Sequence, residues 1–480
     1  MGCNLPDKGK AAVFTRQVEI ADRLPFPWFR SSPPHRVNIM RQPVKRRHFL
    51  QHAATSLAAP MIVRSTMLGA PVKDAPSNRI TIGMIGMGRQ ASAINVRQFL
   101  DAPDTQVVAV CDVDAWRLDR GRAIVEKHYA QQTRSGTYQG CAAYKDFREL
   151  LDRTDIDAVM ISTPDHWHVP IAMAAAKAGK DICCEKPLTR SIHEGRLLSD
   201  LVTKHQCVFR TDSEARSKYS FHRAAELVRN GAIGRIHTIR VGVPQDHVSC
   251  GQPKEMPIPP ELDYNLWLGP AAEVPYTENR VHPRQDYGRG GWMRVSDYSD
   301  GMITNWGAHM VDIAQWGNNS DETGPVEIEA TGHFPQAELW NVLQNFEVHY
   351  RYADGVHMVL RDTKLEYVRF EGTEGWVSAG FGNKSLQSSD DHILQIRFRD
   401  DALKLPHKPE KRDFIDCVKS RQRTQCDAEI GHRTNSVCLL GKIAVEMGTR
   451  LQWDPNKELF VNDPAADKLL SRTMRAPWTL

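Results

Sequence analysis

A glycine-containing hexapeptide and a later aspartate have the spacing of a nucleotide-binding site. The hexapeptide Gly86-Met87-Gly88-Arg89-Gln90-Ala91 follows the apolar segment 79–85 and precedes a stretch of helical character that ends at Leu100. The first glycine permits a tight turn, the second lets the backbone approach a pyrophosphate, and the small Ala91 allows close helix–strand packing. Asp112 follows the apolar segment 106–111, about 21 residues beyond Ala91, where a carboxylate can bond an adenosine ribose 2′-hydroxyl.

This spacing predicts a dinucleotide cofactor held by Gly86, Gly88, Arg89, Gln90 and Asp112. The carboxylate favours NAD over NADP, because the 2′-phosphate of NADP carries negative charge. NADP stays open, since Arg117 and Arg120 lie near enough in sequence to accept that phosphate. The alternative is a glycine turn in an unrelated α/β protein.

Two further polar clusters stand where predicted strands end. Thr163-Pro164-Asp165-His166-Trp167-His168 follows the apolar segment 156–162, and Glu185-Lys186-Pro187 follows the segment 181–184. In open α/β sheets, ligands bind at the carboxyl ends of parallel strands. We therefore expect Thr163, Pro164, His168, Glu185 and Lys186 in the cofactor site.

A third cluster, 301–312, has helical apolar spacing in its later part, which continues to Trp316. On a single helix, Asn305, His309 and Asp312 would share one face. A lone histidine on a helix is more often structural than catalytic, so the interpretation of His309 depends on its surroundings.

Taken together, these motifs resemble the Gfo/Idh/MocA oxidoreductases over residues 79–478. The resemblance implies a Rossmann domain followed by a domain with a large, mostly antiparallel sheet. It implies that Lys186 of the Glu-Lys-Pro tripeptide lies beside substrate and nicotinamide, and that the substrates are sugars, polyols or their derivatives. It also implies that Arg216 and Tyr298 face the substrate.

Oxidation of a secondary alcohol needs a hydride acceptor, a base for the hydroxyl proton and a positive group near the developing alkoxide. Lys186 suits the last role. The alternative to a catalytic role is that Lys186 is a solvated surface lysine. His309 is the natural base at neutral pH, with Asp312 as the group that orients its ring. Family members usually carry aspartate at the position of Asn305. An amide cannot take a proton, so Asn305 can only hold or orient a hydroxyl.

The remaining candidates have competing structural interpretations. His168 either forms part of the nicotinamide pocket or packs at a helix start, and Arg216 and Tyr298 either face the substrate or have a structural role. We predict no metal site, because His166 and His168 at i, i+2 lack a third ligand of defined spacing.

The elements predict an α/β chain with two domains: a Rossmann NAD-binding domain over 79–208 and an α+β substrate and oligomerisation domain over 209–480. The second is indicated by period-two hairpins at 345–360 and 365–379, and helices at about 411–420 and 427–448 follow. A large, mostly antiparallel open sheet in this domain would mediate a homodimer or homotetramer, as is common in the family.

The first 78 residues read as leader rather than domain. Lys45-Arg46-Arg47-His48-Phe49-Leu50-Gln51 precedes the apolar stretch 53–63, the order found in a twin-arginine export signal. We expect a signal and linker over 40–78, a possible upstream extension over 1–39, and a periplasmic or otherwise exported protein. A basic patch before a short surface helix is the alternative.

The composition of the chain limits the kinds of binding partner to be expected. Subtracting 58 acidic from 62 basic residues leaves a net charge of +4 in 480 residues, which gives no reason to expect nucleic acid. No later segment has the length of a membrane anchor. The expected partner is a small-molecule carbohydrate or polyol. Besides a conventional dehydrogenase, two readings stay open: a redox-neutral glycoside-processing enzyme that retains NAD, and an inactive sugar- or nucleotide-binding protein.

Overall fold

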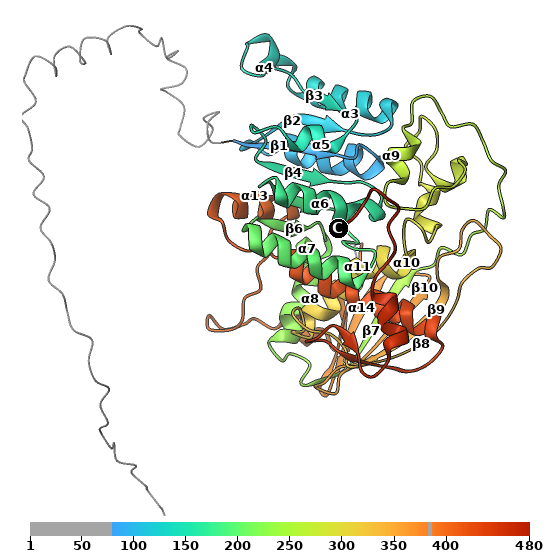
Figure 1. Cartoon of the computed structure of the whole chain (residues 1–480). Coiled ribbons are helices and arrows are strands. Elements are labelled where there is room, and N and C mark those ends of the chain that lie inside the picture. The colour runs from blue at the N-terminus through green and yellow to red at the C-terminus, as the bar shows by residue number, and fades with distance from the viewer. Residues whose placement is uncertain (1–78, 383–385) are drawn as a thin grey trace, which may run out of the picture. The chain divides into compact units, whose positions relative to one another are not determined.

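The computed structural model describes residues 79–382 and 386–480. The proposed signal and upstream extension therefore lie outside the described residues. Within the described residues, no helix is both long and apolar enough to cross a membrane. Figure 1 shows two sheets, each with its own set of helices.

The first sheet has six parallel strands in the order β3-β2-β1-β4-β5-β6, which is the Rossmann order. Its strands are nearly all apolar because helices cover both faces of a parallel sheet. They are β1 (Ile80–Ile85), β2 (Thr105–Cys111), β3 (Ala142–Tyr144), β4 (Ala158–Ile161), β5 (Asp181–Cys184) and β6 (Phe209–Thr211).

The connections of this sheet are helices and short turns. They are η4 (Ala91–Asn95), α2 (Val96–Leu100), α3 (Ala115–His128), α4 (Ala130–Arg134), α5 (Phe147–Leu151), η5 (Asp165–Trp167), α6 (His168–Lys177) and α7 (Ile192–His205). The sixth strand, β6, lies just beyond the boundary at 208 expected from the sequence, so the first sheet continues to residue 211.

The second sheet has nine strands in the order β13-β12-β11-β7-β10-β9-β8-β14-β15, and only the pair β7 and β10 is parallel. Both predicted hairpins are present, as β9–β10 and β11–β12. The strands are β7 (Ile236–Pro244), β8 (Glu327–His333), β9 (Gln344–Arg351), β10 (His357–Thr363), β11 (Tyr367–Gly372), β12 (Gly375–Ala379), β13 (Leu386–Ser388), β14 (Leu451–Asp454) and β15 (Leu459–Phe460).

One face of this sheet packs against α8 (Tyr219–Arg229), α11 (Gly307–Gly317) and α14 (Ala428–Met447), which with it form the largest apolar core. The other elements are η6 (Ala215–Ser217), α9 (Tyr264–Leu268), η7 (Glu278–Arg280), η8 (Gly291–Arg294), α10 (Met302–Asn305), α12 (Asp391–Gln395), α13 (Glu410–Ser420), α15 (Pro464–Asp467) and η9 (Lys468–Leu470).

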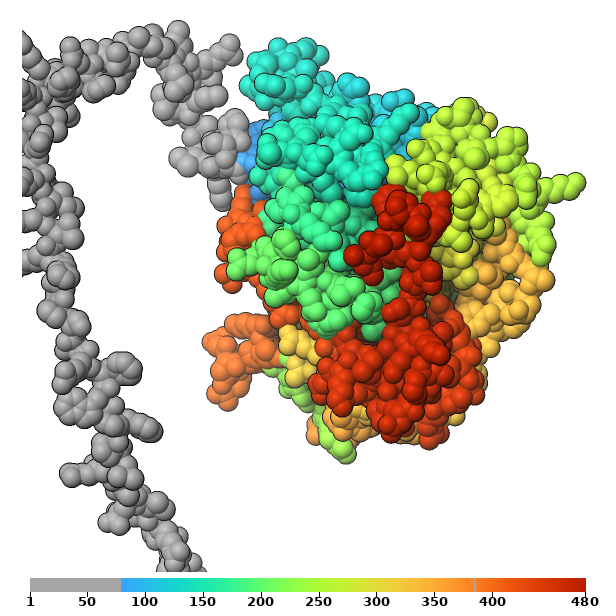
Figure 2. All heavy atoms as spheres, viewed as in Figure 1, coloured from blue at the N-terminus to red at the C-terminus, as the bar shows by residue number. Residues whose placement is uncertain are grey.

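Helix α13 returns to the first sheet, although it follows the second sheet in the chain (Figure 1). Phe414, Ile415 and Cys417 belong to the apolar core of the Rossmann strands, and the Phe414 ring meets the edge of Phe99 at 6.4 Å. The far end of the chain also returns there. In Figure 2 the last residues, dark red, cross the surface between the first-domain helices and the yellow-green segment.

Candidate active site

The glycine loop is built by close packing against the neighbouring strand. Gly86 has φ +87°, and a Cβ there would lie 2.6 Å from the carbonyl oxygen of Ser162, so only glycine fits. A Cβ on Gly88 would instead meet nothing within 4 Å, because this residue faces open space in the cleft. The helix that follows directs its N-terminus toward that space. The loop thus has the form that a pyrophosphate requires.

Asp112 fastens the loop to the end of β2. Its Oδ2 accepts a hydrogen bond from the Met87 amide at 2.7 Å, and its Oδ1 accepts one from the Asp114 amide at 2.9 Å. Burial raises the pKa of this carboxyl to about 6. Each carboxylate oxygen has a second lone pair. The group can therefore hold the loop and accept from a ribose hydroxyl at once.

Arg117 and Arg120, named above for a 2′-phosphate, have other partners. Arg117 is buried and donates to Asp114 Oδ2 at 2.7 Å and to the carbonyl oxygens of Pro283 and Asp286. Arg120 lies over the Trp116 ring and does not line the cleft. Arg117 is therefore held by protein acceptors and Arg120 lies outside the cleft lining, which agrees with the preference for NAD.

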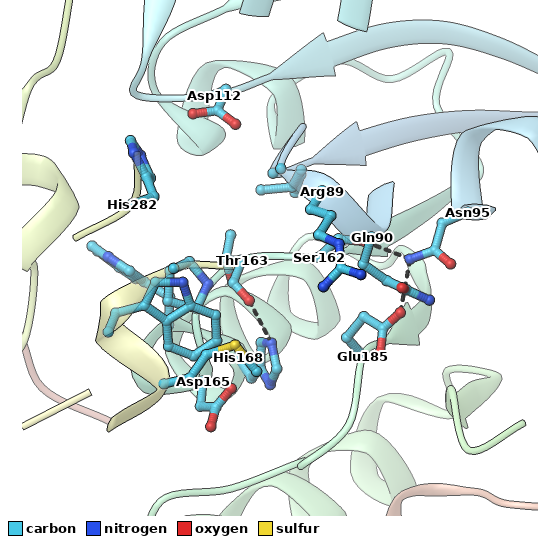
Figure 3. A pocket seen from close by; sticks show the side chains of 18 of the residues that line it. Arg89, Gln90, Asn95, Asp112, Ser162, Thr163, Asp165, His168, Glu185 and His282 are labelled. Atoms are coloured by element: carbon cyan, nitrogen blue, oxygen red, sulfur yellow. Dashed lines mark hydrogen bonds between the residues drawn. The ribbon is translucent and has the colours of Figure 1, made fainter. Parts of the chain in front are cut away.

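The cleft has a volume of about 490 Å³ and runs from Asp112 to the ends of β4 and β5. Every residue predicted from the sequence to bind the cofactor lines it, as do Asn305 and His309: Gly86, Gly88, Arg89, Gln90, Asp112, Thr163, Pro164, His168, Glu185 and Lys186. Figure 3 shows Asp112 at one end of the cleft and Glu185 with Asn95 at the other. Asn95 donates to Glu185 Oε1 at 2.9 Å and to Ser162 Oγ at 3.0 Å.

His168 joins the two strand-end loops. Its Nδ1 lies 2.8 Å from the carbonyl oxygen of Pro187, and its Nε2 lies 2.8 Å from that of Thr163. Burial lowers the pKa of the ring to about 4. A neutral ring has one N–H and donates to one of these carbonyls at a time. His168 lines the cleft, but its polar atoms bind protein, so it positions the Thr163 and Pro187 loops.

Lys186 meets Asn305 across the cleft. Its Nζ donates to Asn305 Oδ1 at 2.7 Å and to the Asn305 carbonyl oxygen at 3.0 Å. Burial lowers the pKa of Lys186, while the neighbouring carboxylates of Glu185 and Asp165 oppose that shift. The Lys186 side chain is therefore fixed in the cleft by two hydrogen bonds and is not a solvated surface lysine.

The predicted single helix over the third cluster is interrupted. Helix α10 ends at Asn305 and α11 begins at Gly307. Because the His309 amide bonds the carbonyl oxygen of Trp306, the carbonyl oxygen of Asn305 is left free to accept from Lys186. The break therefore creates the contact between Asn305 and Lys186.

The prediction that Asp312 orients His309 is wrong. Asp312 is buried on α11 and binds Arg216 through Nε and Nη2 at 2.7–3.0 Å, with Ser213 Oγ at 3.1 Å. His309 Nδ1 is buried without a hydrogen-bond partner, and burial with the charge of Lys186 holds the ring's pKa well below its usual range. His309 is thus a neutral imidazole whose ring is placed by Trp306 and Phe381.

Arg216 and Tyr298 do not face the cleft, contrary to the expectation from the family. Arg216 is 2 % exposed and also pairs with Asp321 at 2.8 Å. Tyr298 is fully buried between His166 and Trp267, with ring centroids 5.0 and 4.8 Å away. Arg216 stabilises the second domain, and Tyr298 packs where that domain meets the Rossmann domain.

Several cleft residues were not predicted from the sequence. Asp165 accepts from Ser299 Oγ at 2.8 Å, and burial raises its pKa to about 7. Asp212 lies beside Glu185 and pairs with Lys411 of α13. Burial and the charge of Asp212 raise the pKa of Glu185 to about 7. No local signal marks Lys411, because it reaches Asp212 only through the packing of α13. In the described residues, no cluster of His, Cys, Asp and Glu could hold a metal ion.

A Rossmann sheet, a glycine cradle and a lysine at the end of β5 define an oxidoreductase of the dinucleotide-binding class. Family models identify which one. The NAD-binding Rossmann fold of the Gfo/Idh/MocA oxidoreductases matches residues 80–213, and the C-terminal alpha/beta domain of the same family matches residues 244–480. The chain belongs to this family.

Individual relatives match over shorter stretches. A myo-inositol 2-dehydrogenase from Thermotoga maritima is 30% identical over 183 residues, 38% of this chain and 47% of that protein. An alpha-N-acetylgalactosaminidase from Shewanella oneidensis is 30% identical over 179 residues, 34% of this chain and 38% of that protein. The match thus spans less than half the length of these curated relatives.

The fold extends further than these sequence matches. The crystal structure of an aldose-aldose oxidoreductase from Caulobacter crescentus superposes with a TM-score of 0.56 over 78% of this chain and 99% of that one, at 16% identity. This likeness establishes the shared two-domain architecture.

NAD fits the residues that are present. Open space at Gly88 leaves room for the pyrophosphate, Asp112 has spare acceptor capacity, and Thr163 Oγ1 is a buried hydroxyl without a partner at the edge of the cleft. An unpaired buried hydroxyl costs free energy unless a ligand satisfies it.

Proposed function

We propose that this protein oxidises a secondary hydroxyl of a sugar, polyol or glycoside with NAD. The observation that carries the proposal is Lys186, whose ammonium is fixed by Asn305 in the same cleft as the glycine cradle and His309. NAD supplies the hydride acceptor when it is bound.

Lys186 stabilises the alkoxide that develops as the hydroxyl loses its proton. An aspartate in place of Asn305 would neutralise the ammonium, whereas the amide oxygen only orients it. The positive charge of Lys186 then acts on the substrate oxygen in the field of the nearby Glu185 and Asp165 carboxyl groups. The replacement of the family's usual aspartate is therefore compatible with catalysis.

His309 takes the hydroxyl proton. Burial and the charge of Lys186 lower the pKa of the ring, so the ring is neutral and has a lone pair to accept with, but it is a weaker base than a free imidazole. Its Nδ1 has no protein partner, so the ring is not committed to another acceptor or donor through that atom. Asp312 takes no part, because Arg216 holds it away from this ring.

The test is NADH formation on a panel of sugars, polyols and glycosides. Lys186→Ala should lower kcat about 10²- to 10³-fold, the usual cost of removing one group that stabilises a developing oxyanion. NAD affinity should stay within a few-fold of wild type. Lys204→Ala, an exposed lysine at the end of α7, is the matched control and should keep full activity. Equal rates in Lys186→Ala and wild type would contradict the assigned role.

A second candidate is redox-neutral processing of a glycoside, supported by the similarity to the Shewanella alpha-N-acetylgalactosaminidase. Transient oxidation at one carbon would assist cleavage, and the hydride would return to the product. Release of the aryl group from aryl glycosides without net NADH would favour this candidate. Carbohydrate binding without turnover on either panel would instead favour a binding protein.

A further inference from the structure

A segment of the second domain forms part of the cleft wall around the predicted cofactor position. Residues 281–291, here called the clasp, run from the end of η7 to the first residue of η8 and belong to neither sheet. The clasp contributes His282, Tyr287, Gly288, Arg289 and Gly290 to the lining. The rest of the wall at this end comes from the Rossmann domain, with Asp112, Val113 and Arg117.

The clasp is anchored above the helix that follows the glycine loop. The Ser92 hydroxyl lies within hydrogen-bond distance of two acceptors, the Met87 carbonyl oxygen at 3.0 Å and the Tyr287 hydroxyl at 3.1 Å. The Tyr287 ring also lies 5.1 Å from that of Trp116 on α3. Tyr287 thus connects the clasp to the residues on both sides of the pyrophosphate cradle.

A second anchor lies at the adenosine end. The Arg117 guanidinium, buried in the Rossmann domain, donates to the carbonyl oxygens of Pro283 at 3.1 Å and Asp286 at 2.7 Å. Because Asp114 also holds Arg117, the clasp is joined to the first turn of α3, directly after the ribose-binding Asp112.

His282 faces the cofactor position from the clasp. Figure 3 shows it across the cleft from Asp112. Its Nδ1 is buried without a hydrogen-bond partner, and its Nε2 lies 3.7 Å from Asp114 Oδ2. Burial lowers the pKa of the ring to about 3, so the ring is neutral at physiological pH. A neutral, incompletely satisfied ring is suited to the uncharged hydroxyls and base of an adenosine.

We propose that the clasp completes the NAD site: His282 contacts the adenosine, Tyr287 closes over the pyrophosphate cradle, and NAD leaves only when these contacts open. The inference rests on the proposed NAD-dependent function and adds residues outside the Rossmann domain to the cofactor site. Slow release would suit a reaction in which one bound NAD is reduced and reoxidised without leaving.

The experiment measures the dissociation rate of NADH from the full chain, by its fluorescence after displacement with excess NAD. Tyr287→Ala removes one hydrogen bond and one aromatic contact, which together correspond to about tenfold faster release. Tyr287→Phe, which keeps the ring, should accelerate release by a smaller factor. Tyr219→Ala changes a tyrosine that is 67% exposed outside the cleft and should release NADH as wild type does.

A second readout does not depend on a folded variant. In wild type, NAD should slow amide hydrogen exchange of residues 281–291 as well as of the glycine loop. Unchanged release in Tyr287→Ala, or exchange protection confined to the Rossmann domain, would overturn the proposal while leaving an NAD-dependent enzyme. A wild-type chain that neither retains nor binds NAD would instead overturn the proposed function itself.

Discussion

At the scale of single residues, burial decides which charged side chains can do chemistry. Arg216 and Asp312, 96 positions apart in the chain, form a buried ion pair with each other. Neither side chain is therefore available to the active site. Lys186 is also largely buried, but its partner is the uncharged Asn305, so its charge stays available. The partner of a buried ion, more than the ion itself, separates structural from functional residues here.

Asp165 gives a prediction of this kind. Its pKa is raised by burial to about 7, against about 3.9 in an unfolded chain, so the native state binds a proton that the unfolded state releases between these values. Stability from this group is present below about pH 4 and is lost as pH rises through 7, by up to about 4 kcal/mol. Asp165→Asn stays neutral and can still accept from Ser299.

The melting temperature of Asp165→Asn should therefore exceed that of wild type by a margin that grows from pH 4 to pH 7.5. Thermal scans of both proteins across this range check it. Asp400→Asn changes an exposed aspartate and should leave the margin flat. A margin independent of pH would show that Asp165 ionises normally in the folded protein.

At the scale of elements, the strands and turns that depend on neighbouring residues in the chain could be predicted from the local sequence. Four strands of the first sheet, β1, β2, β4 and β5, are apolar segments that are followed directly by polar or glycine residues. These strands and the glycine loop were predicted near their observed positions. Strand β3 was missed, because three residues without a buried pattern carry no period. The break at Trp306 was missed because a helix-like pattern continues across it.

Long-range packing could not be read from the sequence. The clasp, α13 and the C-terminal tail reach the first domain from far along the chain, and their contacts depend on where both sheets have placed their surfaces. Most of the site residues that were predicted lie at the Rossmann strand ends, whose convergence follows from parallel strand geometry. Asn305 and His309, on α10 and α11, were predicted from the third cluster and the family resemblance. Of those that were missed, Tyr287 comes from the second half of the chain, whereas Asp165 and Asp212 follow the Rossmann strands β4 and β6.

The tail over residues 471–480 makes a testable contribution to the first domain. The Trp478 ring meets the edge of Trp167 at 4.7 Å, and Arg475 donates to the carbonyl oxygens of Asn265 and Gly269 at 3.0 Å. Trp167 lines the cleft next to His168. A chain that ends at Leu470 should therefore melt several degrees lower and bind NAD more weakly, because the loop 163–168 loses its outer support.

Differential scanning calorimetry and NAD titration of the shortened chain measure both effects. Trp478→Ala should reproduce part of each loss, whereas Lys457→Ala, an exposed lysine before the tail, should reproduce neither. A shortened chain with unchanged melting and affinity would mean that the tail only rests on the surface.

At the scale of the whole molecule, the second sheet has one face covered by α8, α11 and α14 and another that no described helix covers. This outer face is rich in charged side chains that pair across strands. Glu371 of β11 accepts a hydrogen bond from Arg240 of β7 and forms an ion pair with Arg369 of its own strand. The Arg369 guanidinium also lies 4.0 Å from the centre of the Trp376 ring. Polar faces of this kind are either wetted or paired with a matching surface.

We predict that two copies of the chain pair through this face, since it presents both signs of charge in rows that an antiparallel copy can complement. Light scattering of the purified chain should give a mass of at least twice 54.2 kDa.

Arg369→Glu places a like charge beside Glu371 and should shift the protein toward a single chain, whereas Arg122→Glu on the exposed side of α3 should not. NAD affinity should persist in the dissociated form, because none of the residues that line the cleft lies on a strand of this sheet. A wild-type mass of 54.2 kDa at micromolar concentration would mean that the face is wetted, and its ion pairs would then serve to keep an open sheet from associating.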